Sequence, residues 1–151
     1  LALDTGRTAA SRVAQPSGSS DTLDDGRLTA REIYDIQLNA DLVVLSACRT
    51  GLGAVSGDGV IGLARAFLYA GTPSVVATLW DVADEPAARL MPSLYRSLRR
   101  VPDKAQALRR AQLTLLHDLR SGRVSVQTKS GTTTLAEHPI LWASFILVGK
   151  P

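Results

Sequence analysis

Two short segments made almost wholly of apolar residues most constrain what this chain can fold into. Residues 42–47 read Leu-Val-Val-Leu-Ser-Ala, and residues 74–80 read Ser-Val-Val-Ala-Thr-Leu-Trp. Both are rich in β-branched side chains and lack the polar alternation of a strand with one face in water. They predict two strands that are covered on both faces.

Helical patterns follow each predicted strand. Apolar residues recur every three or four positions over 60–68, and Gly71 is a suitable helix stop. Two further amphipathic helices are expected around 90–98 and 108–119, with Pro102 in the first turn of the second. Before the first strand, Thr29-Ala-Arg-Glu32 has capping-box spacing and predicts a helix ending near residue 39.

The alternation of strand and helix predicts one α/β domain over 1–151 with a mainly parallel sheet and right-handed crossovers. Residues 1–26 are expected to be a flexible loop, because they are Ser/Thr/Gly/Asp-rich with few large apolar residues. Residues 121–134 predict a hairpin or loose loop, and 142–148 a final strand. Ligands bind beyond the carboxyl ends of strands in such folds, which directs attention to Cys48 and to residues 81–85.

Composition excludes several classes of site. One cysteine cannot form an internal disulfide, and with two scattered histidines it offers no closely spaced zinc ligand set. No apolar run reaches the roughly 18 residues of a membrane span, and no signal peptide is evident. We therefore expect a cytoplasmic domain without a metal or other cofactor and without a membrane partner.

The net charge of +3 is mild, yet much of the positive charge is concentrated between two predicted helices. This cluster is either a solvated helix surface or a site for an acidic partner, with nucleic acid the least favoured partner. Its members are Arg96, Arg99, Arg100, Lys104, Arg109 and Arg110.

Cys48 lies where a buried strand meets a glycine-rich loop, residues 51–59. That position suits a nucleophile, although an inert core cysteine would fit it as well. The surrounding Ser46-Ala-Cys-Arg-Thr-Gly51 resembles the nucleophile segment of CHAT domains, relatives of caspases and separases. Four further segments resemble that family in order, namely 25–32, 59–68, 74–80 and 138–149.

The resemblance implies a caspase-like, three-layer αβα sandwich, here the C-terminal part of a CHAT domain, that hydrolyses peptide bonds with a Cys-His dyad. Cys48 takes the nucleophile's place, and backbone N–H groups around Arg49, Thr50 and Gly51 would form the oxyanion hole. A protein or peptide substrate is implied, with regulatory repeat or sensor regions elsewhere in the full-length chain. No metal or cofactor is needed.

The family's histidine precedes the nucleophile, in an aliphatic-His-x-Ala-x-His-Gly stretch that this sequence lacks. Residues 1–47 contain no histidine, so we expect the dyad histidine to lie upstream and this fragment alone to be inactive. His117 and His138 are expected to be structural. The alternative is a catalytically inactive CHAT-like interaction module that binds a partner through its Arg-rich helices.

Trp80-Asp-Val-Ala-Asp84 resembles the separase-like loop whose acidic side chains line the pocket for the residue before the cut. Asp81 and Asp84 therefore predict cleavage after a basic residue. Alternatively, Asp84 or Glu85 merely caps the next helix.

A weaker alternative is a nucleotide site, because Gly51-Leu-Gly-Ala-Val-Ser-Gly57 superficially matches a dinucleotide fingerprint, with Asp81 as the ribose ligand. Against it, Cys-Arg-Thr precedes the first glycine, and the helical pattern is expected only from about Gly59, too late to hold a pyrophosphate.

Overall fold

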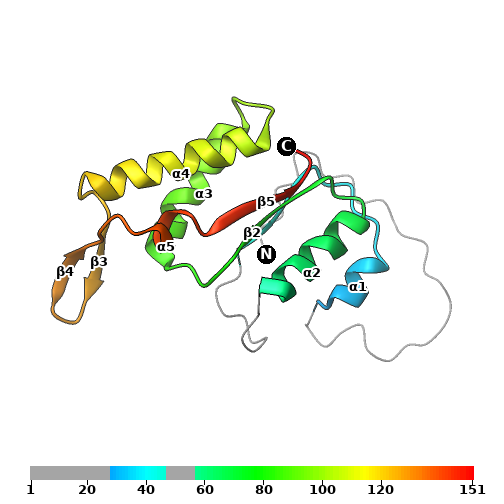
Figure 1. The fold of residues 1–151 in the computed structure, drawn as a ribbon, viewed down its shortest axis with the longest axis horizontal. Helices are drawn as coiled ribbons and strands as arrows, with labels where there is room; N and C mark the ends of the chain where they lie inside the picture. The colour runs from blue at the N-terminus through cyan, green and yellow to red at the C-terminus, as the bar shows by residue number, and fades with distance from the viewer. Residues whose placement is uncertain (1–27, 47–56) are drawn as a thin grey trace.

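The computed structural model describes residues 28–46 and 57–151, and a small mixed sheet lies at its centre (Figure 1). Strand β1 (Val43–Leu45) pairs in parallel with β2 (Ser74–Thr78), and β2 pairs antiparallel with β5 (Phe145–Gly149). Every residue of β1 and β2 is buried. The prediction that both segments are strands covered on both faces is confirmed.

Helices lie on both faces of this sheet (Figure 1). On one face, Val43 and Val75 pack in a core with residues of α1 (Ala30–Tyr34) and α2 (Gly57–Tyr69). On the other, Val44 and Val76 pack with residues of α3 (Asp84–Leu98) and α4 (Lys104–Arg120). The assignment follows the two-residue period of a strand, which sends alternate side chains to opposite faces. The α/β class is confirmed, while the caspase-like three-layer sandwich stays a prediction.

The expectation of a mainly parallel sheet is wrong for the described residues, because β5 runs antiparallel to β2. After α4 the chain forms a hairpin, β3 (Ser125–Thr128) and β4 (Gly131–Thr134), and then the short helix α5 (Pro139–Trp142). These elements return the chain to the carboxyl end of β2, so that Phe145 pairs with Thr78 and Gly149 with Ser74. The apolar pattern of a strand is the same for parallel and antiparallel pairing, so the pattern could not predict the direction of β5.

Local signals set several helix ends. The capping box is present: Thr29 Oγ1 accepts from the Glu32 N–H at 3.4 Å, and Glu32 Oε2 accepts from the Thr29 N–H at 2.6 Å. The helix nevertheless ends at Tyr34, not near residue 39, because the Leu38 N–H donates to the carbonyl of Ala70 at 2.7 Å. A tertiary hydrogen bond therefore replaces the next helical turn.

The boundary before α4 also differs from the prediction. Pro102 lies outside the helix, because Asp103 is the N-cap and its carboxylate accepts from the Gln106 N–H at 2.8 Å. A capping carboxylate satisfies an orphan N–H group, which proline cannot do. The predicted inner stripe of α4 is confirmed, with all four members buried: Leu108, Ala111, Leu115 and Leu119.

One end of the sheet, residues 71–74 with 149–150, is tightly joined, and we call it the closed end. Gly71 ends α2 with a φ of 109°, as predicted for a helix stop. The Ser74 hydroxyl donates to the carbonyl of Lys150 at 2.6 Å, and the Lys150 N–H donates to the carbonyl of Pro73 at 2.8 Å. The amino end of β2 is therefore fixed to the end of β5. In the described residues, no helix is both long and apolar enough to cross a membrane.

Candidate functional site

The candidate site is the end of the sheet opposite the closed end, where β1 and β2 end and β5 begins. We call this end the rim. The parallel register pairs Leu45 with Ala77, so both strands deliver the chain to the same edge. Ser46 follows β1 and is exposed, and Leu79 follows β2. This geometry confirms that the segment leading toward Cys48 and the Asp81 loop leave the sheet together.

Trp80 fixes the loop after β2 to the segment before β5. The Leu79 N–H donates to the carbonyl of Ser144 at 2.8 Å, and Trp80 Nε1 donates to the carbonyl of Ile140 at 2.9 Å. The Trp80 side chain remains 38% exposed at the same edge. The rim therefore presents an aromatic side chain held by α5.

Asp81 and Asp84 occupy different elements. Asp81 is exposed in the loop after β2, whereas Asp84 is the first residue of α3, so the predicted 81–85 loop is shorter than expected. The N-cap is Ala83, without a side-chain cap bond, so the alternative that Asp84 or Glu85 serves as the N-cap is wrong. Both carboxylates nevertheless stand in the first turn, which the helix dipole favours.

Glu85 differs from Asp84 in its partner. It accepts from Arg89 Nε at 2.9 Å, one turn along α3. The Asp84 carboxylate is exposed and forms no ion pair with the other residues that the structure describes. Of the acidic residues that begin α3, Asp84 is the one available to a ligand.

The predicted nucleophile and oxyanion residues, Cys48, Arg49, Thr50 and Gly51, lie outside the described residues. So does most of the glycine fingerprint considered for a nucleotide. Helix α2 begins at Gly57, two residues before the expected start near Gly59. The roles assigned to these residues remain predictions.

Both histidines are described, and the side-chain hydrogen bond of His138 agrees with a structural role. His138 is the N-cap of α5, where its Nδ1 accepts from the Ile140 N–H at 3.3 Å. His117 is exposed in the last turn of α4. In the described part of the chain, no three His, Cys, Asp or Glu side chains could together hold a metal ion.

Ser144 is a rim residue that the sequence pattern did not single out. It is fully buried just before β5, and its Oγ has no hydrogen-bond partner within the described residues. Unpaired buried hydroxyls are uncommon and call for a physical reason. The one available signal was a serine interrupting the apolar run 142–148.

Comparison with known proteins finds a matching family model and two relatives. A family model described as the CHAT domain matches residues 2–150. Tetratricopeptide repeat protein 28 from Homo sapiens is 34% identical over 123 residues, and that from Mus musculus is 32% identical over the same length. The match covers 82% of this chain but only 4% of each relative. No solved structure matches. Because the matched family model covers residues 2–150, the chain belongs to the CHAT-domain family.

Proposed function

We propose that this domain is a cysteine-type endopeptidase in which Cys48 attacks the scissile carbonyl at the rim. The observation that carries the proposal is the parallel pairing of β1 with β2, which brings Ser46 and the Asp81 loop to one edge. Cys48 follows Ser46 by two residues in the sequence. Family membership supports the same assignment, since CHAT domains are generally linked to peptidases.

In the proposed reaction, the Cys48 thiolate adds to the carbonyl carbon of the substrate, and backbone N–H groups around Arg49, Thr50 and Gly51 stabilise the oxyanion. The C–N bond then breaks, and an imidazolium gives its proton to the leaving amine. Water attacks the resulting thioester and releases the acid product together with the thiol. The step needs no metal or cofactor.

The imidazole must come from residues other than the two histidines in this sequence. His138 uses Nδ1 to cap α5, and His117 is exposed in the last turn of α4. We therefore place the dyad histidine upstream of this sequence, on a caspase-like, three-layer framework completed by preceding residues. Regulatory repeat regions elsewhere in the intact protein fit the name of the tetratricopeptide repeat relatives.

The substrate residue before the cut is proposed to be Arg or Lys. Asp81 is exposed in the loop that follows Trp80, and Asp84 is exposed in the first turn of α3, four positions after this partly exposed tryptophan. A guanidinium or ammonium would form charge-assisted hydrogen bonds there, and its aliphatic stem could lie on the indole ring.

Reporter peptides test both parts of the proposal in the intact protein. Cys48→Ala should abolish hydrolysis, while Asp81→Asn and Asp84→Asn should lower kcat/KM for Arg reporters about tenfold or more with less change for Leu reporters. Glu85→Gln is the matched control, because that carboxylate is already paired with Arg89. Undiminished cleavage by Cys48→Ala would refute the mechanism, and equal or better cleavage after Leu or Asp would refute the basic preference.

The second candidate is an interaction module of the same family without peptidase activity. The observation favouring it is that residues 1–47 contain no histidine. It predicts no hydrolysis of any reporter by the intact protein, with unchanged partner binding in Cys48→Ala. Reporter hydrolysis that depends on Cys48 would exclude it.

A further inference from the structure

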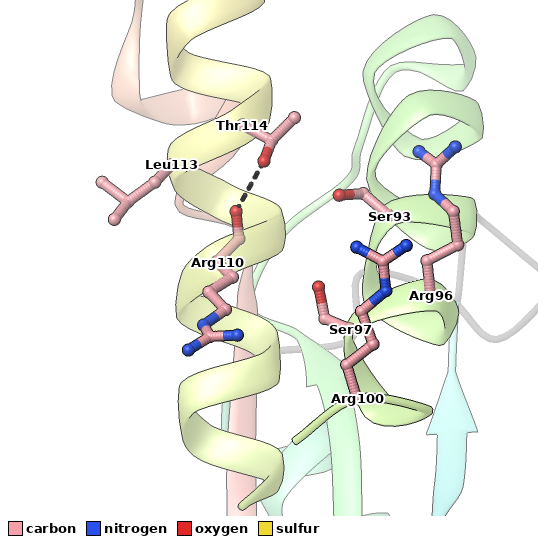
Figure 2. Close-up of a pocket in the computed structure, with 7 residues that line it drawn as sticks. All are labelled: Ser93, Arg96, Ser97, Arg100, Arg110, Leu113 and Thr114. Carbon is pink, nitrogen blue, oxygen red and sulfur yellow. Dashed lines mark hydrogen bonds between the residues drawn. The ribbon is translucent and has the colours of Figure 1, made fainter.

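A basic groove lies between α3 and α4, beyond the first turn of α3 that carries Asp84 (Figure 2). Its volume is about 410 Å³. Three arginines, three hydroxyl side chains and one leucine line it: Arg96, Arg100, Arg110, Ser93, Ser97, Thr114 and Leu113. Ser93, the groove residue nearest to Asp84 along α3, lies nine positions from it, or roughly 14 Å at about 1.5 Å per helical residue. The groove is therefore separate from the rim.

The arginines of the groove are not neutralised by the rest of the described chain. All three groove arginines are exposed. The ion pairs among the described residues are formed by different arginines, namely Arg89, Arg120 and Arg123. No residue lining the groove is acidic. The positive charge is therefore available to a ligand.

The polar groups around the groove are mainly hydrogen-bond donors. Figure 2 shows Ser93 and Ser97 pointing from α3 toward α4, with the Arg100 guanidinium beside them. Arginine has five N–H donors and no acceptor, and its planar fork matches a carboxylate. Ser93 is only 8% exposed, so its position is fixed by packing. This set of side chains suits an anion with several acceptor oxygens.

We propose that this groove binds an acidic peptide segment of a partner protein. Leu113 is 46% exposed at the groove and offers an apolar contact beside the charges, as a peptide with mixed side chains requires. A single-stranded nucleic acid would need aromatic side chains on which bases stack, and none lines the groove. Carboxylates on successive turns of the bound segment would meet Arg96 and Arg100, which are one turn apart.

The neighbouring arginines provide a matched test. Arg100→Gln/Arg110→Gln removes two groove charges, whereas Arg99→Gln/Arg109→Gln removes the adjacent exposed charges that do not line the groove. Binding of a fluorescein-labelled deca-glutamate peptide to the intact protein is measured by anisotropy at two salt concentrations. Deca-glutamine and a single-stranded DNA of matched charge serve as comparison probes.

The groove variant should bind deca-glutamate at least about tenfold more weakly, because each charge-assisted hydrogen bond that is lost contributes strongly to the binding free energy. The control variant should change it by less than about threefold, since exposed charges outside the site act weakly. No binding, equal loss in both variants, or tighter binding of the DNA would each overturn the proposal. Unfolding curves of both variants should match that of the parent protein.

Discussion

The two ends of the central sheet are built differently, although each contains a fully buried serine, Ser74 as the first residue of β2 and Ser144 just before β5. At the closed end, the Ser74 hydroxyl has a partner at 2.6 Å, and backbone hydrogen bonds join residues 73 and 150. At the rim, the Ser144 hydroxyl has no partner within the described chain, and Leu79 and Trp80 are partly exposed. The closed end also contains one buried hydroxyl without a partner in the described chain, that of Thr72, so the two ends differ in the hydrogen bonds that join their strands and in the exposed side chains of the rim.

This difference agrees with where α/β folds bind ligands. The rim is the carboxyl end of both parallel strands, β1 and β2, where loops carry function. The closed end contributes to stability instead. Substitutions at the closed end should therefore reduce folding stability, whereas those at the rim should mainly change chemistry.

The largest stability effect is expected at Gly149. Its φ is 103°, and an added Cβ would lie 2.4 Å from the carbonyl oxygen of Pro73. Gly149→Ala should lower the free energy of unfolding by about 3 kcal/mol, combining backbone strain with overpacking. Urea denaturation measures it, with Gly131→Ala as control, because that site has a φ of 125° but open space. Equal losses at both sites would show that close packing at the closed end contributes nothing.

A smaller loss is expected for Ser74→Ala. The change removes the buried hydroxyl that donates to the carbonyl of Lys150 in a partly buried hydrogen bond. The free energy of unfolding should fall by about 1–2 kcal/mol. Chemical denaturation with an unchanged m-value checks this, and no loss would mean that water replaces the hydroxyl.

Ser144→Ala should raise the free energy of unfolding, whereas Ser74→Ala should lower it. The buried hydroxyl has no partner in the described part of the chain, so its removal relieves a desolvation cost and should stabilise the fold by up to about 1 kcal/mol. The same denaturation measurement compares it directly with Ser74→Ala. Destabilisation similar to that of Ser74→Ala would erase the distinction between the two ends.

Glu85→Gln should have the smallest effect. The Glu85–Arg89 pair is one helical turn apart, and both side chains are 37% exposed. Solvent screens such pairs, so the free energy of unfolding should change by no more than about 0.5 kcal/mol. A thermal unfolding midpoint that falls by many degrees would show that the Glu85 charge stabilises the fold by more than its exposed ion pair with Arg89 explains.

The sequence predicted well those features that depend on local patterns. The buried strands, the capping box at Thr29 and the inner stripe of α4 all follow from residue spacing. The direction of β5 did not, because it depends on how the hairpin and α5 return the chain. The four-residue helix α5 is too short to show a period.

The candidate site was predictable in part. Parallel strands bring their carboxyl ends together, so the common edge for Ser46 and Asp81 could be inferred from the strand pattern. The Trp80 bond to Ile140 spans 60 positions and could not be read from local spacing. The same holds for the groove, since Arg100 and Arg110 line one cavity only because α3 packs against α4.

Alkylation of Cys48 tests the central claim most directly. The intact protein is treated with iodoacetamide at pH 6–8, and modification of the peptide containing Cys48 is followed by mass spectrometry. Because a dyad stabilises the thiolate, modification at pH 6 should be much faster than that of a free cysteine and should slow when the upstream histidine is replaced. Modification at the rate of an ordinary thiol, unchanged by that replacement, would contradict it.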